Sequence, residues 1–335
     1  MWTYLLRRLL LLIPVLLGLT VLVFAIARLL PGDPVALAAG PNASPAEIAA
    51  YGREFGLDRP LWEQYLRYLG GLLQGDFGVS IYTRRPVIED LRAYLPATLE
   101  LVLAAMTLAV AIGLPMGLWA AVQRDRWPDY LSRVLALGAI SMPRFFLGLL
   151  LQLGLAMALG WLPLGGRFPI TEELPLRVTG FLTVDALLAG NFTAFWVACQ
   201  HLLMPALAMS LSPLATIMRM MRGSTLEVLQ QDYVLTERAL GLPQRLIITK
   251  YVARNAISAT LTVIGLYFGW LLGGTVLVET VFDWPGLGLY ATKAVVTQDF
   301  MPIIGVTLVI GTLFVLVNLL VDLLYGLINP KVRPG

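Results

Sequence analysis

Long apolar segments dominate the pattern of hydrophobic and polar positions along this chain of 335 residues. A helix needs about 20 apolar residues to cross the hydrocarbon core of a bilayer. The first apolar segment exceeds the core of an ordinary signal peptide, which favours an uncleaved span. The pattern predicts an all-α, polytopic membrane protein with six transmembrane helices. They are expected at residues 9–30, 101–122, within 134–166, 200–218, 255–278 and 300–321.

The distribution of basic residues predicts the orientation of these spans. Six spans place both termini on one side of the membrane, and short cytoplasmic segments are enriched in Lys and Arg. With the termini inside, three basic residues fall in short outer segments, at Arg167, Arg177 and Lys293. At least twelve fall in inner segments, and we therefore expect both termini in the cytoplasm. The twelve are Arg7, Arg8, Arg124, Arg126, Arg219, Arg222, Arg238, Arg245, Lys250, Arg254, Lys331 and Arg333.

A long polar loop follows the first span. Ser44 is a candidate N-cap for a helix at 45–55, and apolar residues recur at helical spacing over 60–73. This loop either caps the helix bundle or docks an external partner, and the two roles are compatible. The chain is thus expected to divide into residues 1–30 with the first span, a folded loop at 31–96, and a helical core at 97–330.

Residues 219–254 form the largest inner loop. Helical patterns run over 224–229 and 233–240, and Gly241 and Pro243 then favour a stop and a restart. The pattern predicts a helical hairpin that returns to the membrane. Its simplest interpretation is a solvated hairpin with the arginines typical of inner loops, and the alternative is a docking surface.

Composition narrows the possible functions. Apolar residues make up 58% of the chain and charged residues 13%, against about 25% charged residues in soluble domains. One His and one Cys exclude an intrachain disulfide and leave little for a metal centre or a catalytic triad. No G-x-x-x-x-G-K-[ST] motif occurs, so we expect no ATP site in this chain. The net charge of +3 fits inner arginines better than nucleic-acid binding.

Several short motifs are spread over essentially the whole chain. In order, they are LPGDP at 30–34, GLDRPL at 56–61, LQGDFG at 73–78, DYVLTERALGL at 232–242, ETVFDWPGLG at 279–288 and NLLVDLLY at 318–325. These motifs resemble those of ABC importer permeases, and more narrowly those of the dipeptide/oligopeptide/nickel branch. The length of the insert between the third and fourth spans is most similar to dipeptide permeases.

The resemblance implies a non-catalytic subunit of an ATP-driven importer in the cell inner membrane. It implies the permease fold, with a folded periplasmic loop after the first helix. Such a permease pairs with a second homologous permease subunit, and an external binding protein delivers the substrate. Two ABC ATPase subunits bind ATP and Mg, so this chain would hold no cofactor or metal of its own.

The inner hairpin matches the family's coupling helix, which transmits the motion of one ATPase to the membrane. The general motif begins Glu-Ala-Ala and has a glycine six residues after the Glu. In this chain Gly241 is the shared glycine, and Leu235, Thr236 and Glu237 take the places of Glu-Ala-Ala. We expect Glu237 to meet a basic residue of the ATPase and to give partner specificity. The implied coupling residues are Asp232, Thr236, Glu237, Arg238, Ala239, Gly241, Leu242 and Pro243.

Arg144 is the most unusual residue of the apolar segments. An arginine inside the bilayer costs about 2.5–3.5 kcal/mol on insertion scales. It either lines the translocation path and attracts a substrate carboxylate, or it lies near an interface or pairs with Asp322 or Glu100. Gly273 and Gly274 either permit a close helix approach or mark a gate. The candidate path residues are Ser141, Pro143, Arg144, Gly273 and Gly274.

The last third of the chain holds a candidate outer site. Asp283, Trp284, Pro285 and Gly286 lie in one motif, with Glu279 and Asp299 nearby. They either contact the binding protein or form a rigid turn that caps the mouth of the pathway.

The expected substrates are dipeptides or short oligopeptides. Nickel chelates, glutathione or another small ligand remain alternatives, because the external binding protein sets most of the substrate choice in this branch. A self-contained secondary transporter would need paired ionisable residues within several spans, and only Arg144 qualifies here.

Overall fold

The structure is a computed structural model, and it describes residues 2–29, 44, 46, 59–169, 171 and 175–328. All regular elements in this part of the chain are helical. Five helices are long and apolar enough to cross a membrane, and a bent pair of helices makes a sixth candidate. The predicted all-α membrane fold is confirmed. The chain divides into two compact units, formed by residues 1–5, 96–289 and 313–335 and by residues 6–95 and 290–312.

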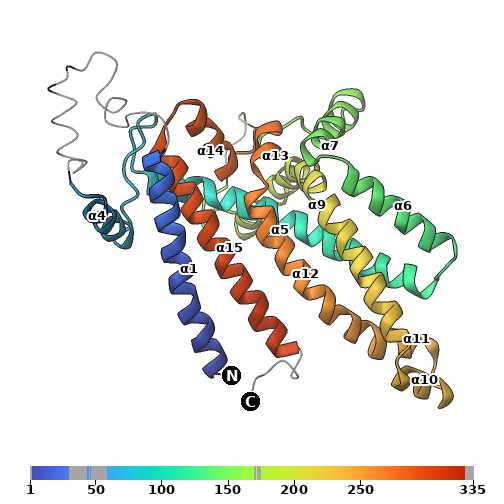
Figure 1. The fold of residues 1–335 in the computed structure, drawn as a ribbon. Helices are drawn as coiled ribbons and strands as arrows, with labels where there is room; N and C mark the ends of the chain where they lie inside the picture. Colours follow the sequence, from blue (N-terminus) through green and yellow to red (C-terminus); the bar gives the residue numbers. More distant parts are fainter. Residues whose placement is uncertain are drawn as a thin grey trace. The chain divides into compact units, whose positions relative to one another are not determined.

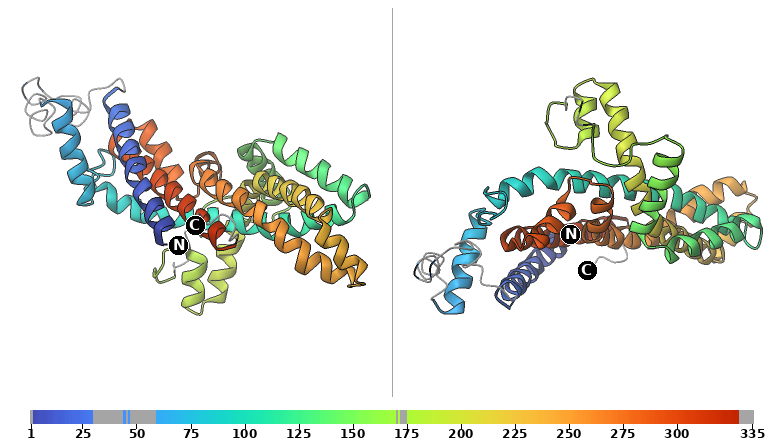
Figure 2. Two further views of the ribbon diagram at one scale, coloured as in Figure 1. Left: turned by 60° about the horizontal axis from the view of Figure 1, so that its bottom comes forward. Right: turned by 90° about the horizontal axis from the view of Figure 1, so that it is seen from above.

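The larger unit is built around one long helix, α9 (Phe192–Leu229), which packs against both α6 and α12 (Figures 1 and 2). Its remaining helices are the part of α5 (Val87–Val122) from residue 96 onward, α6 (Trp127–Ser141), α7 (Arg144–Leu151), η1 (Gln152–Ala158), α8 (Leu182–Leu188), α10 (Asp232–Ala239), α11 (Gln244–Leu246), η2 (Ile247–Val252), α12 (Ala253–Gly273), α13 (Val276–Val281) and the part of α15 (Phe300–Ile328) from residue 313 onward. The segments η1 and η2 are π-helical.

Glycines let the helices of this unit approach closely. A Cβ atom at Gly117 on α5 would lie 2.4 Å from the carbonyl oxygen of Met218 on α9, and Gly113 lies one turn away on the same face. Gly265 and Gly269 on α12 leave the same kind of space for side chains of α15 (Phe300–Ile328). Small residues spaced by four allow such contacts between membrane helices. A Cβ atom at Gly273 would meet nothing within 4 Å, so the expected close helix approach is not made there.

The third predicted span is a bent pair of helices. The axes of α6 and α7–η1 differ by 101°. Pro143 disfavours the helical conformation at the residue before it, and Met142 is extended with φ −99° and ψ 126°. The fifth predicted span also ends earlier than expected, because α12 ends at Gly273 and Gly274 separates it from α13. Two successive glycines give a helix little stability.

The smaller unit contains most of α1 (Trp2–Leu29), α4 (Leu61–Leu73), residues 290–296 of α14 (Leu287–Val296) and the first part of α15. Figure 1 shows α1 beside α15, where Gly311 leaves space for the side chain of Leu19. The hydroxyl groups of Thr20 and Tyr65 lie 2.9 Å apart and tie α1 to α4. The helix predicted over 60–73 is confirmed as α4, whereas the helix predicted at 45–55 and the motif at 30–34 lie outside the described residues.

Buried carboxylates fix the rest of this unit. Asp90 is fully buried and accepts hydrogen bonds from the hydroxyl groups of Thr83 and Tyr290. Asp299 accepts a hydrogen bond of 2.6 Å from the hydroxyl of Ser80. These bonds hold residues 80–90 against residues 290–299.

Candidate functional site: a helical hairpin and a membrane cavity

The predicted hairpin is present and begins where α9 ends at Leu229. It consists of α10, a reversal at residues 240–243 and α11, which continues through η2 into α12. These bounds confirm the predicted helix over 233–240 and its restart after Pro243.

A small apolar cluster holds the hairpin against the ends of the membrane helices. Val234 of α10 is completely buried and packs with Ile247 and Val252 of η2. The partly buried Val228, Leu229 and Leu242 complete the cluster. Full burial of one such side chain is worth about 1.5–3 kcal/mol, so α10 is held against α9 and η2 although it has only 8 residues.

Gly241 makes the chain reversal after α10. Its φ is +76°, a backbone conformation that glycine adopts readily and most other residues adopt only at a cost. Its N–H donates to the carbonyl of Arg238 at 3.0 Å, and that of Leu242 donates to Glu237 at 3.3 Å. These bonds satisfy carbonyl groups at the end of α10, as glycine-terminated helices commonly do.

The face of the hairpin that points away from the other helices is exposed. Among the predicted coupling residues, Glu237 and Leu242 are half-buried. The hydroxyl of Thr236 donates within its own helix, to the carbonyl of Asp232. The hairpin also exposes Leu235 and Leu240, so its open surface is mixed polar and apolar. The exposed residues among those predicted for coupling are Asp232, Thr236, Arg238, Ala239, Gly241 and Pro243.

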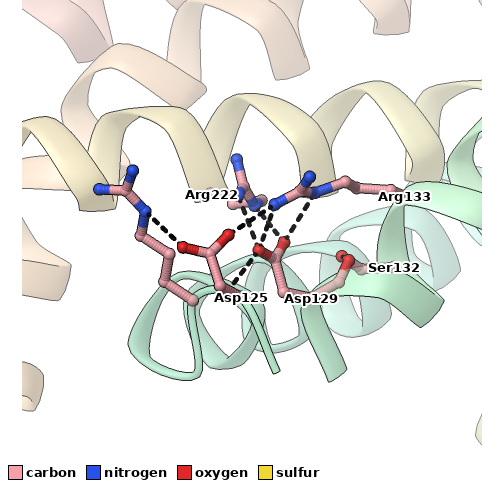
Figure 3. A network of polar contacts seen from close by, with 6 residues as sticks. Asp125, Asp129, Ser132, Arg133 and Arg222 are labelled. Carbon is pink, nitrogen blue, oxygen red and sulfur yellow. Dashed lines mark hydrogen bonds and ion pairs between the residues drawn. The ribbon is translucent and has the colours of Figure 1, made fainter. Parts of the chain in front are cut away.

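An ionic cluster joins α6 to α9 a short distance before the hairpin (Figure 3). Asp129, at the start of α6, is fully buried and binds the guanidinium groups of Arg133 and Arg222. It also accepts a hydrogen bond of 3.0 Å from the backbone N–H of Asp125. A buried carboxylate needs this many donors because isolated burial of its charge is costly.

Arg144 lines a cavity of about 350 Å³ between α6, α7 and α9. A Cβ atom at Gly274 would lie 2.8 Å from Nη1 of Arg144, so these two predicted path residues lie together. Gly273, Ser141 and Pro143 do not line the cavity. The hydroxyl of Ser141 donates to the carbonyl of Leu137 within α6.

Glu100, one of the predicted partners of Arg144, is engaged elsewhere. Its carboxylate binds Arg167 and accepts hydrogen bonds from the backbone N–H and hydroxyl of Thr183. The ion-pair alternative between Arg144 and Glu100 is therefore wrong. The side chain of Asp322, the other candidate, lies outside the described residues.

Two residues of the predicted outer site, at 283–286, are buried within the larger unit. Trp284 is 1% exposed and its indole N–H donates to the carbonyl of Ala97 at 2.9 Å. Gly286 is buried, and a Cβ atom there would lie 2.5 Å from the carboxylate of Glu279. Asp283 is exposed, with a φ of +47°. The arrangement is a rigid turn, and a binding-protein contact stays a prediction for Asp283 and the half-buried Pro285.

The core of this turn is Glu279, which the sequence analysis groups with the candidate outer site. It is fully buried and accepts hydrogen bonds from the hydroxyl of Thr98 and the N–H of Leu289. Burial raises the pKa of Glu279 above its usual range, while these donors oppose the shift. The alternation of glycines at Gly286 and Gly288 is the signal for this site, since both leave room for the carboxylate.

Sequence reasoning missed three elements of the candidate site. Val234 stands beside Leu235 in a helix of 8 residues, which is too short for a periodic signal to single out the buried one. Asp129 reads as an ordinary acidic residue of a short loop. The cavity wall on α6 and α9 cannot be found without knowing that the two helices pack together.

The helices long enough to cross a membrane and the hairpin between α9 and α12 define a polytopic membrane protein. Residues 113–334 match the family described as "Binding-protein-dependent transport system inner membrane component". Residues 1–102 match the corresponding N-terminal family. The chain belongs to this family and is a multi-pass inner-membrane permease subunit of a transporter.

Relatives match the chain along nearly its full length. The dipeptide transport system permease protein DppB of Alkalihalophilus pseudofirmus is 43% identical over 333 residues, which cover 99% of this chain and 100% of the relative. The probable D,D-dipeptide transport system permease protein DdpB of Escherichia coli is 44% identical, with coverage of 100% and 98%. The glutathione transport system permease protein GsiC of Salmonella paratyphi A is 41% identical, with coverage of 99% of each.

Proposed function

We propose that this chain forms half of the translocation pathway of an ATP-driven importer of dipeptides or short oligopeptides. The other half is a second, homologous permease subunit. Two ABC ATPases supply the energy with ATP and Mg, and an extracytoplasmic binding protein delivers the peptide. Relatives that are named as dipeptide permeases and are 43% and 44% identical over nearly the whole chain support this substrate class.

The hairpin at residues 232–243 carries the proposal for the mechanism. One face of the hairpin is open, while Val234 and its apolar neighbours pack it against α9 and against η2, which continues into α12. A force on α10 is therefore transmitted to two membrane helices. In this proposal α10 is the coupling helix, which lies in a groove of one ATPase, and this chain performs no chemistry itself.

The orientation follows from the same proposal. A hairpin that meets an ATPase lies in the cytoplasm, together with both chain termini. This agrees with the twelve basic residues assigned to inner segments and three assigned to outer segments. A fusion of alkaline phosphatase to either terminus is expected to be inactive, and an active fusion would contradict this orientation.

Glutathione import is the second candidate, because a glutathione permease is 41% identical over the same length. The test is uptake by proteoliposomes that contain the full transporter and its binding protein. We expect ATP-dependent uptake of a labelled dipeptide that excess glutathione and a nickel chelate do not inhibit. Inhibition by glutathione at equal concentration would favour the second candidate. Purification without ATPases or a second permease would contradict the subunit role itself.

A further inference from the structure

The cavity beside Arg144 has the composition of a site for an amphiphilic anion. Its volume of about 350 Å³ falls in the range of small-molecule pockets. Its wall is almost entirely apolar, and only two of its side chains are polar, Arg144 and Ser212. The apolar lining consists of Val134, Leu135, Gly138, Ala139, Met142, Leu147, Ala208 and Leu211.

Arg144 has no acidic partner among the described side chains, since every ion pair there involves another base. Its guanidinium lies against Gly274, where a larger residue would displace it. A guanidinium binds a carboxylate through two parallel hydrogen bonds. An apolar lining lowers the local dielectric constant and so strengthens such a contact.

Gly138 leaves space on the α6 wall of the cavity. A Cβ atom at this position would meet nothing within 4 Å, although the residue lines the cavity. The cavity can therefore accept a side chain of its ligand on the α6 wall while the charged end meets Arg144.

We propose that Arg144 binds the C-terminal carboxylate of the peptide in transit, with a peptide side chain against the apolar wall of α6 and α9. This proposal rests on the proposed peptide import and names the chemical group that the pathway recognises. The contact gives this permease its own preference for free peptide acids, in addition to the choice made by the binding protein.

The proposal is tested by thiol protection in the full transporter, held in lipid nanodiscs without the binding protein. Cys199 is the only cysteine, so Cys199→Ala gives a background into which Ser212→Cys places one probe on the cavity wall. The dipeptide Ala-Phe is expected to slow maleimide labelling of this probe at least about tenfold more strongly than its C-terminal amide does. Val178→Cys, at a position 64% exposed and outside the cavity, is the control probe and should show no protection.

Variants of the cavity separate the carboxylate contact from general effects. Arg144→Leu should remove the difference between acid and amide, whereas Arg144→Lys should keep part of it. Gly138→Leu fills the cavity and should remove protection by both peptides. Arg124→Leu removes a charge at a side chain 58% exposed and should leave the difference unchanged.

Three results would overturn the proposal. They are equal protection by acid and amide, no protection by either, and a difference that survives Arg144→Leu. Equal loss of dipeptide uptake in Arg144→Leu and Asp322→Asn, with no effect on protection, would favour the ion pair with Asp322. The proposed peptide import is tested by a separate measurement. If it is wrong, the unmodified transporter shows no peptide uptake, whatever the protection experiment shows.

Discussion

The guanidinium of Arg222 on α9 donates two hydrogen bonds to the carboxylate of Asp129 on α6. Nη2 lies 2.9 Å from Oδ2, and Nε donates to Oδ1. Arg222 is only 21% exposed and Asp129 is fully buried. The pair lies near the end of α9 that leads to the hairpin, while the same two helices line the cavity further along. In the proposed coupling mechanism, this pair would keep α6 and α9 moving together when an ATPase displaces α10.

Asp129→Asn should loosen this connection. The amide can accept from only one of its two terminal atoms, so Arg222 and Arg133 lose part of their partner. We expect a loss of about 1–3 kcal/mol in the free energy of unfolding and a lower ratio of peptide transported to ATP hydrolysed. The thermal midpoint in detergent and the transport ratio in proteoliposomes measure the two effects.

Asp125→Asn is the matched control for this cluster. Asp125 is 63% exposed and pairs with Arg124 at 3.3 Å and with Arg133 at 3.5 Å. Exposed ion pairs contribute about 0–1 kcal/mol, so this variant should stay near wild type. Similar losses in both variants would show that the buried carboxylate has no special role.

Gly241 offers a test of the reversal after α10. Nothing lies within 4 Å of an added Cβ, so a substitution meets no clash and its cost comes from the positive φ alone. Gly241→Val should strain the reversal by about 1 kcal/mol or more and reduce peptide uptake per ATP, with normal insertion. Gly241→Asn should retain most coupling, because Asn tolerates this conformation. The ratio of uptake to hydrolysis measures the difference, and equal behaviour of the two variants would contradict the explanation.

Glu237 is expected to select the ATPase partner. It is half-buried on α10, beside an exposed face, and the described residues provide it with no ion-pair partner. Glu237→Lys should slow association with the ATPase and make binding less sensitive to salt, because charges at the rim of an interface act mainly on the association rate. Glu237→Gln is the milder control. Unchanged copurification and salt dependence in Glu237→Lys would rule out a basic contact on the ATPase.

The sequence predicts elements whose signal is local. Apolar length gives the spans, and Gly241 with Pro243 gives the hairpin, because a positive φ and a fixed proline φ act on their own residues. Features that depend on packing between distant segments escape it. The buried position of Trp284 is one example, since its hydrogen bond reaches back to Ala97. The use of Glu100 by Arg167 and Thr183 is another.

We predict that protonation of Asp185 opens the structure locally in the larger unit at low pH. It is 3% exposed, and its carboxylate accepts hydrogen bonds from the N–H and hydroxyl of Thr179, both at 2.7 Å, and from the N–H of Gly180 at 2.9 Å. Burial alone would raise the pKa of Asp185, but these hydrogen bonds hold it below its usual value. The folded pKa lies below the unfolded pKa of about 3.9, so the stabilisation is complete above that pH and is lost as the pH falls through the folded pKa.

We therefore expect the amide protection factors of Thr179 and Gly180 to fall on acidification below about pH 4, as measured by hydrogen exchange with mass spectrometry. Asn191 provides an internal control, because its side-chain oxygen accepts from the N–H of Ala194 at 2.9 Å and does not titrate. Asp185→Asn should lower protection at neutral pH, by about 1–3 kcal/mol of opening free energy, and remove the pH dependence. Protection that falls equally at Ala194 and at Thr179 would indicate global acid unfolding and contradict the local role of Asp185.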